Sequence, residues 1–193
     1  MFSPAAERNK EPIFKVLQPR LNQASRLLEI ACGSLQHACY MAPQLPALEW
    51  LPTDIDQEAL KYGQSLTSRP DSVAPPVYLD VHEDTWPIDD VDAVYAANLL
   101  HISPASVMAA LFEGCGRALR PDGAVHLYGP FKQNGRYTSP GDAAFDDNLQ
   151  SRNPAWGIRN LEDVLSAAQA AGIRLSEQTA MPANNWLLTF RRE

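Results

Sequence analysis

Three short apolar runs in the first half of the chain each end beside a residue that could bind a ligand, namely Gly33, Asp54 and Asp80. A glycine lets the main chain turn tightly and approach a ligand, and an acidic residue about 20 positions later can accept hydrogen bonds from ribose hydroxyls. Asp80 could accept from the amino group of adenine. The spacing therefore predicts a nucleoside site, although Asp54 could instead cap the helix region at Asp56 and Asp80 could be a loop or cap residue.

Two further candidates for chemistry, His101 and Tyr128, follow later apolar runs at residues 92–98 and 124–128. An imidazole titrates near neutral pH and therefore suits a general base. The Tyr128 hydroxyl could polarise the nucleophile of a second substrate. For both residues, packing in the core or at the rim of the site is the alternative.

Polar side chains in three segments are candidates for binding that second substrate. Residues 7–10 lack apolar spacing and precede the first expected helix, so residues 1–22 are expected to form a lid. A polar, irregular active-site loop is expected at residues 129–159, and a third segment precedes the last strand. The candidates are Glu7, Arg8, Asn9, Lys132, Arg136, Arg159, Asn184 and Asn185. Guanidinium and amide groups favour a small polar or acidic substrate, although surface solvation explains any one of them equally well.

A parallel sheet would bring these candidates together. Apolar residues at helical spacing, with their start and stop signals, predict helices at residues 11–21, 35–42, 103–119 and 161–171, and Asp56 is the N-cap of one more. Strands are expected at residues 26–31, 48–53, 77–81, 92–98, 124–128, 174–179 and 186–190. This alternation predicts an α/β fold whose mostly parallel sheet carries helices on both faces and binds ligands at the carboxyl ends of its strands.

Composition narrows the class of protein. A chain of 193 residues, 45% hydrophobic and 20% charged, suits one domain, residues 1–193. The net charge of -7 argues against nucleic acid as a partner. No run resembles a signal peptide or a membrane span, so a cytoplasmic location is expected without membrane association. Cys32, Cys39 and Cys115 form neither an even disulfide set nor a Cys-x-x-Cys pair, and no metal is expected. The oligomeric state stays open.

The chain resembles class I S-adenosylmethionine-dependent methyltransferases. Their first motif, an apolar strand followed by an acid and a glycine-containing turn, corresponds to Leu-Leu-Glu-Ile-Ala-Cys-Gly at residues 27–33, and the resemblance continues through Asp54, Asp80, residues 98–101 and residues 119–123. It implies a Rossmann-like, doubly wound sheet of seven strands that is mostly parallel and closes with an antiparallel hairpin. It also implies S-adenosylmethionine as cofactor, held by Glu29, Ala31, Gly33, Asp54, Ile55, Asp80, Val81 and Asn98.

Two departures from the glycine pattern of that family fall at Ala31 and Leu35. Leu35 adds bulk where the following helix approaches the strand and the ligand. We therefore expect Leu35 to narrow the methionine end of the pocket or to shift the helix.

Nearly the whole chain is also similar to an uncharacterised methyltransferase-like family of bacteria and animals, of the type called domain of unknown function 938. The strings that carry this similarity lie at residues 3–13, 36–38, 128–132, 144–146, 156–159 and 181–185. The family implies methyl transfer to a small molecule without identifying that molecule.

Two other functions remain open. The chain could be a catalytically silent protein that binds the cofactor or a partner. It could also be a nicotinamide-dependent oxidoreductase, because the same strand-end acid could hold that cofactor's ribose. The absence of a Gly-x-Gly-x-x-Gly phosphate turn from the sequence disfavours the oxidoreductase.

Overall fold

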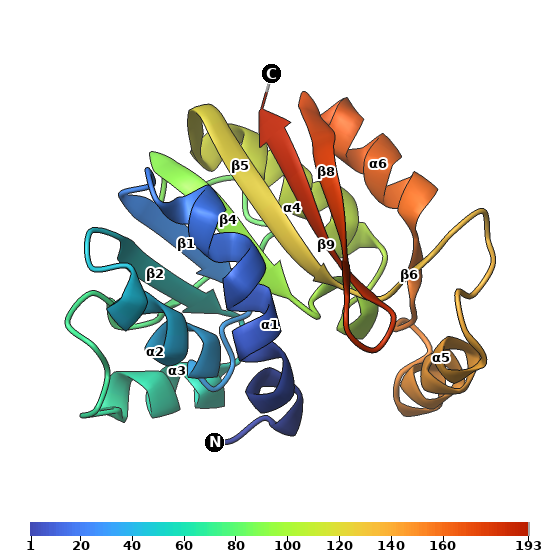
Figure 1. Cartoon of the computed structure of the whole chain (residues 1–193), viewed down its shortest axis with the longest axis horizontal. Helices are drawn as coiled ribbons and strands as arrows, with labels where there is room; N and C mark the ends of the chain where they lie inside the picture. Colours follow the sequence, from blue (N-terminus) through green and yellow to red (C-terminus); the bar gives the residue numbers. More distant parts are fainter. Residues whose placement is uncertain (193) are drawn as a thin grey trace.

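Seven strands form one twisted sheet in the computed structural model shown in Figure 1, which describes residues 1–192. The strands are β1 (Arg26–Ile30), β2 (Glu49–Asp54), β3 (Val77–Tyr78), β4 (Val91–Ala97), β5 (Leu119–Gly129), β8 (Ile173–Met181) and β9 (Asn185–Arg192). Their order across the sheet is β3-β2-β1-β4-β5-β9-β8, and β9 runs antiparallel to both of its neighbours while the other pairings are parallel. The predicted Rossmann-like sheet with a C-terminal antiparallel hairpin is confirmed.

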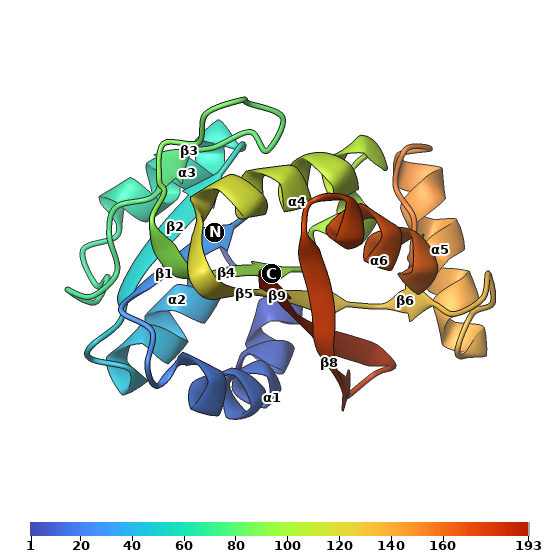
Figure 2. The same ribbon diagram turned by 90° about the horizontal axis from the view of Figure 1, so that it is seen from above.

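Helices cover both faces of this sheet. They are α1 (Pro4–Leu21), α2 (Gln36–Met41), α3 (Gln57–Ser65), α4 (Ser106–Ala118), α5 (Pro140–Arg152) and α6 (Leu161–Ala170). Short 3-10 helices span Ala42–Gln44 and Leu100–Ile102, and β6 (Phe131–Lys132) pairs with β7 (Arg159–Asn160) in a small second sheet. Figure 2 shows α1 and α2 on one face and α4 and α6 on the other.

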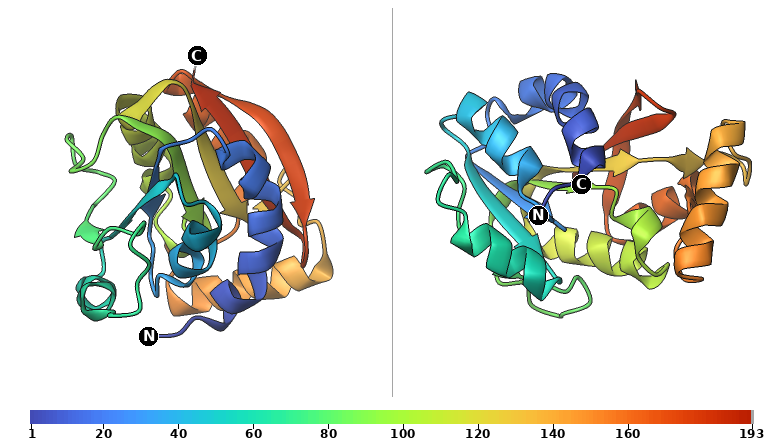
Figure 3. Two further views of the ribbon diagram at one scale, coloured as in Figure 1. Left: turned by 60° about the vertical axis from the view of Figure 1, so that its left-hand side comes forward. Right: turned by 90° about the horizontal axis from the view of Figure 1, so that it is seen from below.

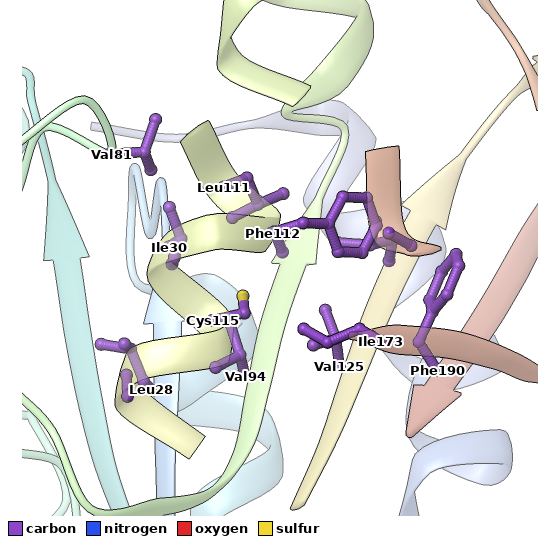
Figure 4. Packing of buried hydrophobic residues seen from close by; sticks show 14 of the residues in the cluster. Leu28, Ile30, Val81, Val94, Leu111, Phe112, Cys115, Val125, Ile173 and Phe190 are labelled. Carbon is purple, nitrogen blue, oxygen red and sulfur yellow. The ribbon is translucent and has the colours of Figure 1, made fainter. Parts of the chain in front are cut away.

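The apolar core has two parts, one on each face of the sheet. Successive strand residues point to opposite faces, so Leu28 of β1 packs with α4 and Leu27 packs with α1 and α2. Figure 4 shows Phe112 and Cys115 of α4 above the strands. Because both faces are covered, the central strands are buried almost throughout, which explains their continuous apolar runs.

The first helix begins earlier than expected. α1 starts at Pro4, where Ser3 is the N-cap and its Oγ accepts a hydrogen bond from the Ala6 amide at 3.2 Å. The expectation that residues 7–10 precede the helix is therefore wrong. The polar face of the first turns concealed the start of the helix, although serine before proline is a known initiation signal.

The expectation of a long irregular loop at residues 129–159 is also wrong, because this segment contains α5, β6 and the start of β7. Ser139 caps α5 and Pro140 occupies its first position. The buried residues of α5 are Asp142, Asp146 and Leu149, so its inward face is largely polar and shows no apolar periodicity. Figure 3 shows α5 beyond the carboxyl end of β5, set apart from the main sheet.

Four strands differ by three or more residues from the predicted lengths, because β8 and β9 are longer than expected and β3 and β5 also differ. The expected strand at residues 77–81 pairs only over Val77–Tyr78, and β5 continues through residues 120–123 instead of starting after them. The greater length of β5 includes an irregularity in its pairing with β4, between Val91 and Ala93, where Asp122 of β5 has a φ of 64°. Among residues 1–192, no helix is long and apolar enough to cross a membrane.

Candidate functional site

The order of the strands fixes where a ligand site should lie. The chain moves from β1 outward through β2 and β3 and then returns to β4 on the other side of β1. Connections therefore diverge at the carboxyl ends of β1 and β4, and open α/β sheets bind ligands in this crevice. Gly33 follows β1 and Asn98 follows β4, so both lie at this point.

The loop after β1 has a left-handed backbone at each of its three glycine-pattern positions. The φ angles are 59° at Ala31, 51° at Gly33 and 58° at Leu35. A Cβ added to Gly33 would meet nothing within 4 Å, so the space over this residue is open. The loop has therefore kept the backbone conformation of a glycine-rich turn although only one of the three residues is glycine.

Leu35 does not obstruct this loop, so the expectation that it narrows the pocket is wrong. Its side chain is fully buried in the core beneath α1 and α2 and reaches toward α3, where its Cδ1 lies 2.8 Å from the position of a Cβ on Gly63. The left-handed backbone at Leu35 directs the side chain away from the open space above Gly33.

Leu35→Gly is expected to lower the free energy of unfolding by about 2 kcal/mol, because the loss of a buried leucine outweighs the relief of left-handed strain. Ala31→Gly is the matched control and should raise that free energy by about 0.5 kcal/mol. Urea denaturation measures both. A Leu35→Gly protein as stable as the wild type would contradict the core role of Leu35.

Asp54 connects the first two loops at the carboxyl edge of the sheet. Its Oδ2 accepts from the Gly33 amide at 2.8 Å, and its Oδ1 accepts from the Asp56 amide at 2.9 Å. The structure thus includes the local contact to Asp56 foreseen as the alternative, together with one to the glycine loop. The residue is 7% exposed and each oxygen retains a lone pair, so the carboxylate can still accept from ligand hydroxyls.

Three other predicted cofactor residues lie beside Asp54. Ile55 is 55% exposed, which is unusual for an isoleucine and offers an apolar surface next to the carboxylate. The Leu79 amide donates to the Asp54 carbonyl at 3.1 Å, which places Asp80 and the buried Val81 near the same edge. The exposed side chain of Ile55 and the carboxylate of Asp80 could therefore contact a planar nucleobase at this edge.

Glu29 lies beneath the loop. It is 2% exposed and accepts a hydrogen bond from Trp50 Nε1 at 2.7 Å. Burial raises the pKa of Glu29 to about 8, the Trp50 hydrogen bond opposes this rise and the charge of Asp54 adds to it. A largely neutral carboxyl at the end of β1 is therefore held between Trp50 and His37, which lies 4.0 Å away.

A cavity of about 560 Å³ lies over the ends of β4 and β5, beside the open carboxyl edge around Gly33 and Asp54, which we call the cleft. Its walls come from one face of α1, one face of α5, the two strand ends and the β8–β9 turn. The lining residues are Ala5, Arg8, Asn9, Pro12, Asn98, His101, Tyr128, Pro130, Gly141, Asp142, Phe145, Pro182, Ala183, Asn184 and Asn185. The fold therefore brings seven of the predicted site residues together: Arg8, Asn9, Asn98, His101, Tyr128, Asn184 and Asn185.

Tyr128 ends a buried hydrogen-bonded chain beneath the cavity. His37 Nε2 lies 2.7 Å from Asn9 Oδ1, and His37 Nδ1 lies 3.1 Å from the Tyr95 hydroxyl. Because the amide oxygen of Asn9 only accepts, His37 Nε2 carries the proton that it shares with this oxygen. The NH₂ group of Asn9 is left to donate. Burial raises the pKa of Tyr128, while hydrogen bonding from Asn9 and the charge of Arg8 act against that rise. The chain leaves the Tyr128 proton available to the cavity.

His101 is held as a neutral imidazole. Burial, followed by the charge of Arg159, lowers its pKa to about 4, although Asp146 opposes the shift. The ring meets Phe145 edge to face, with centroids 5.5 Å apart, and its Nδ1 lies 3.4 Å from the position of a Cβ on Gly129. At neutral pH it can accept a proton, but only as a weak base.

The other predicted substrate residues are not among those that line the cavity. Lys132 forms an ion pair with Asp146 at 2.8 Å, and Arg159 donates to the main-chain oxygens of Leu100, Ser103 and Ala155. Glu7 binds Lys10 and Gln36, and Arg136 is exposed beyond β6. Lys132 and Arg159 hold the walls of the cavity in place from outside.

Three residues of α5 that line the cavity, Gly141, Asp142 and Phe145, were not predicted from the sequence. Their segment was expected to be irregular, so no face could be assigned to it. A capping signal was present, because Ser139 and Pro140 are followed by the acidic Asp142 at the third helical position. The Ser139 hydroxyl also accepts from Asn184 at 2.8 Å, which joins α5 to the β8–β9 turn.

Comparison with known proteins identifies related families and folds. A family model described as a protein of unknown function (DUF938) matches residues 1–192. The structure of human N-acetylserotonin methyltransferase in complex with SAM is similar with a TM-score of 0.83 at 15% identity, over 97% of this chain and 52% of that one. A putative O-methyltransferase from Nostoc punctiforme is similar with a TM-score of 0.83 at 17% identity, over 98% and 57%. PigF with SAH is similar with a TM-score of 0.80 at 14% identity, over 96% and 56%. The chain spans somewhat more than half the length of these proteins and shares their fold.

Proposed function

The chain belongs to the DUF938 family and has the fold of S-adenosylmethionine-dependent methyltransferases, and from this premise we propose that it transfers a methyl group from S-adenosylmethionine to a small polar or acidic molecule. The observation that carries the proposal is the loop after β1, which keeps a glycine-like backbone beside the carboxylate of Asp54. The proposed reaction requires no metal.

The residues at the carboxyl edge fit the cofactor. Gly33 leaves open space above the main chain, Asp54 can accept from ribose hydroxyls, and exposed Ile55 offers a surface for the base. Asp80 and Val81 complete the base side, and Asn98 lies between the cleft and the cavity. Ala31 belongs to the loop itself, and Glu29 lies in β1 directly before it. When bound, S-adenosylmethionine supplies an electrophilic methyl group on a positively charged sulfur.

The cavity beside Asn98 is the proposed acceptor site. Its volume of about 560 Å³ suits a small molecule. Within the described lining, Arg8 is the only cationic side chain, and its charge acts on Tyr128 across the cavity. Asp142 is the one lining carboxylate and already accepts from Thr138 Oγ1 at 2.6 Å. Arg8 with the amides of Asn184 and Asn185 favours an anionic or strongly polar acceptor.

The basicity of His101 bears on the acceptor group. During transfer a bond forms from the acceptor to the methyl carbon, the sulfur–carbon bond breaks, and any proton on the acceptor must leave. A base whose pKa is about 4 accepts this proton poorly from a phenol or an ammonium group, because both of these groups have a pKa of about 10. A carboxylic acid is already ionised at neutral pH and needs no base. Tyr128 donates a hydrogen bond that orients the acceptor oxygen. We therefore propose carboxylates as acceptors.

The test supplies the purified protein with deuterium-labelled S-adenosylmethionine and separate pools of carboxylic acids, phenols and amines. Mass spectrometry should detect labelled methyl groups in the carboxylic acid pool, with less product from Arg8→Gln and Tyr128→Phe. Labelling of phenols or amines alone would contradict the acceptor class. Cofactor binding without product in any pool would favour a catalytically silent binding protein.

A further inference from the structure

His82 links the proposed base-binding carboxylate to the start of α4. Its main-chain amide and its Nδ1 both approach Asp80 Oδ1, at 3.0 Å and 2.9 Å, and its Nε2 lies 3.1 Å from Ser106 Oγ. Ser106 is the first residue of α4. His82 is therefore fixed at both ring nitrogens, although it lies on an exposed connection between β3 and β4.

These contacts use the two oxygens of Asp80 unequally. Oδ1 accepts both donors from His82, whereas no hydrogen-bond donor from residues 1–192 reaches Oδ2. The carboxyl side chain is 30% exposed, so Oδ2 remains accessible. Because Oδ1 is held by His82, the orientation of the carboxylate is fixed, and Oδ2 can accept a hydrogen bond only from a defined direction.

That free oxygen lies on the base side of the cleft. Tyr78 pairs with Asp54 in the sheet, and the following Leu79 amide donates to the Asp54 carbonyl at 3.1 Å. Asp80 is the next residue and Ile55 is the residue after Asp54, so the carboxylate and the exposed apolar side chain follow neighbouring strand ends. A base lying on Ile55 would direct one edge toward Asp80.

We propose that His82 is a positioning residue that sets nucleobase specificity by fixing Asp80 so that Oδ2 accepts the exocyclic amino group of adenine. The proposal rests on the proposed function and concerns a residue that does not itself touch the cofactor. A base with a carbonyl oxygen at that position would meet the carboxylate without a shared proton, and a site built to accept a hydrogen bond rejects such an analogue.

The test compares calorimetric binding of S-adenosylhomocysteine and S-inosylhomocysteine, which differ in that amino group. The wild type should prefer the adenine compound by about 30-fold or more. His82→Ala should reduce this ratio to a few-fold, and His82→Asn, whose amide can replace Nδ1 as a donor, should restore most of it. Asp80→Asn should abolish the preference, because an amide can donate to the carbonyl as well as accept from the amine.

Glu83→Gln is the control, since Glu83 is the exposed neighbour of His82 and its carboxylate is not part of this chain of contacts. It should keep the wild-type ratio. A His82→Ala protein with the wild-type ratio would overturn the proposal, and so would tighter binding with a larger ratio, which would mean that His82 competes with the base. If the wild type bound neither nucleoside, the proposed function itself would fail.

Discussion

Asp54→Asn is expected to weaken binding of S-adenosylhomocysteine about 100-fold, because it removes the charge proposed to accept the ribose hydroxyls and disturbs the loop that carries Gly33. Each Asp54 oxygen accepts a main-chain amide, from Gly33 and from Asp56. An asparagine has one acceptor oxygen, so one of these amides would face an NH₂ group. Isothermal titration calorimetry measures the change.

Asp56→Asn is the matched control. Asp56 caps α3 by accepting from the Glu58 amide at 2.8 Å, and asparagine is an equally good N-cap, so affinity and stability should remain close to those of the wild type. An analogue of S-adenosylhomocysteine lacking the ribose hydroxyls gives a test that is independent of folding, since it should bind the unaltered protein weakly. Asp54 does not bind the ribose if the Asp54→Asn variant keeps its affinity and the unaltered protein also binds the analogue without loss.

Asp146→Ala is expected to release the segment around α5, at a cost of about 2 to 4 kcal/mol in local stability. Asp146 is fully buried and accepts from Lys132 at 2.8 Å, the Tyr137 hydroxyl at 2.7 Å and the Ile158 amide at 2.6 Å. Hydrogen exchange and limited proteolysis of residues 133–158 should show faster opening. Methyl transfer should be lost while S-adenosylhomocysteine still binds, because α5 forms one wall of the proposed acceptor cavity and no part of the proposed cofactor loop.

Asp147→Ala provides the comparison at the next position. Asp147 is exposed, so its loss should change neither the protection of α5 nor methyl transfer. If both variants behaved alike, or if Asp146→Ala abolished cofactor binding as well, the division into a cleft and a separately supported cavity would be contradicted.

The centre of the sheet could be predicted because β1 and β4 are buried on both faces and appear in the sequence as largely apolar runs. α5 could not be predicted by the same means, because two of its three buried residues are aspartates. Their partners, among them Thr138 for Asp142 and Lys132 for Asp146, reach them only in the folded chain. Its N-cap was readable at Ser139. The early start of α1 was readable in the same way at Ser3 and Pro4, but the polar residues that follow were interpreted as a free segment.

The candidate site was predictable where strand ends determine position, as for Gly33, Asp54 and Asn98. Side-chain direction was not predictable. Lys132 and Arg159 lie close in sequence to residues that line the cavity, but neither lines it. Lys132 pairs with the buried Asp146, and Arg159 donates to three main-chain carbonyl groups. Leu35 shows the same limit, because its left-handed backbone turns a bulky side chain into the core and leaves the loop open.

The most direct test of the account is calorimetric titration of the purified protein with S-adenosylmethionine and S-adenosylhomocysteine, with a nicotinamide dinucleotide as control. Micromolar or tighter binding of both sulfur compounds and no binding of the dinucleotide are expected. Binding of the dinucleotide alone, or of none of the three, would contradict the assignment of the cleft over Gly33 and Asp54 to S-adenosylmethionine.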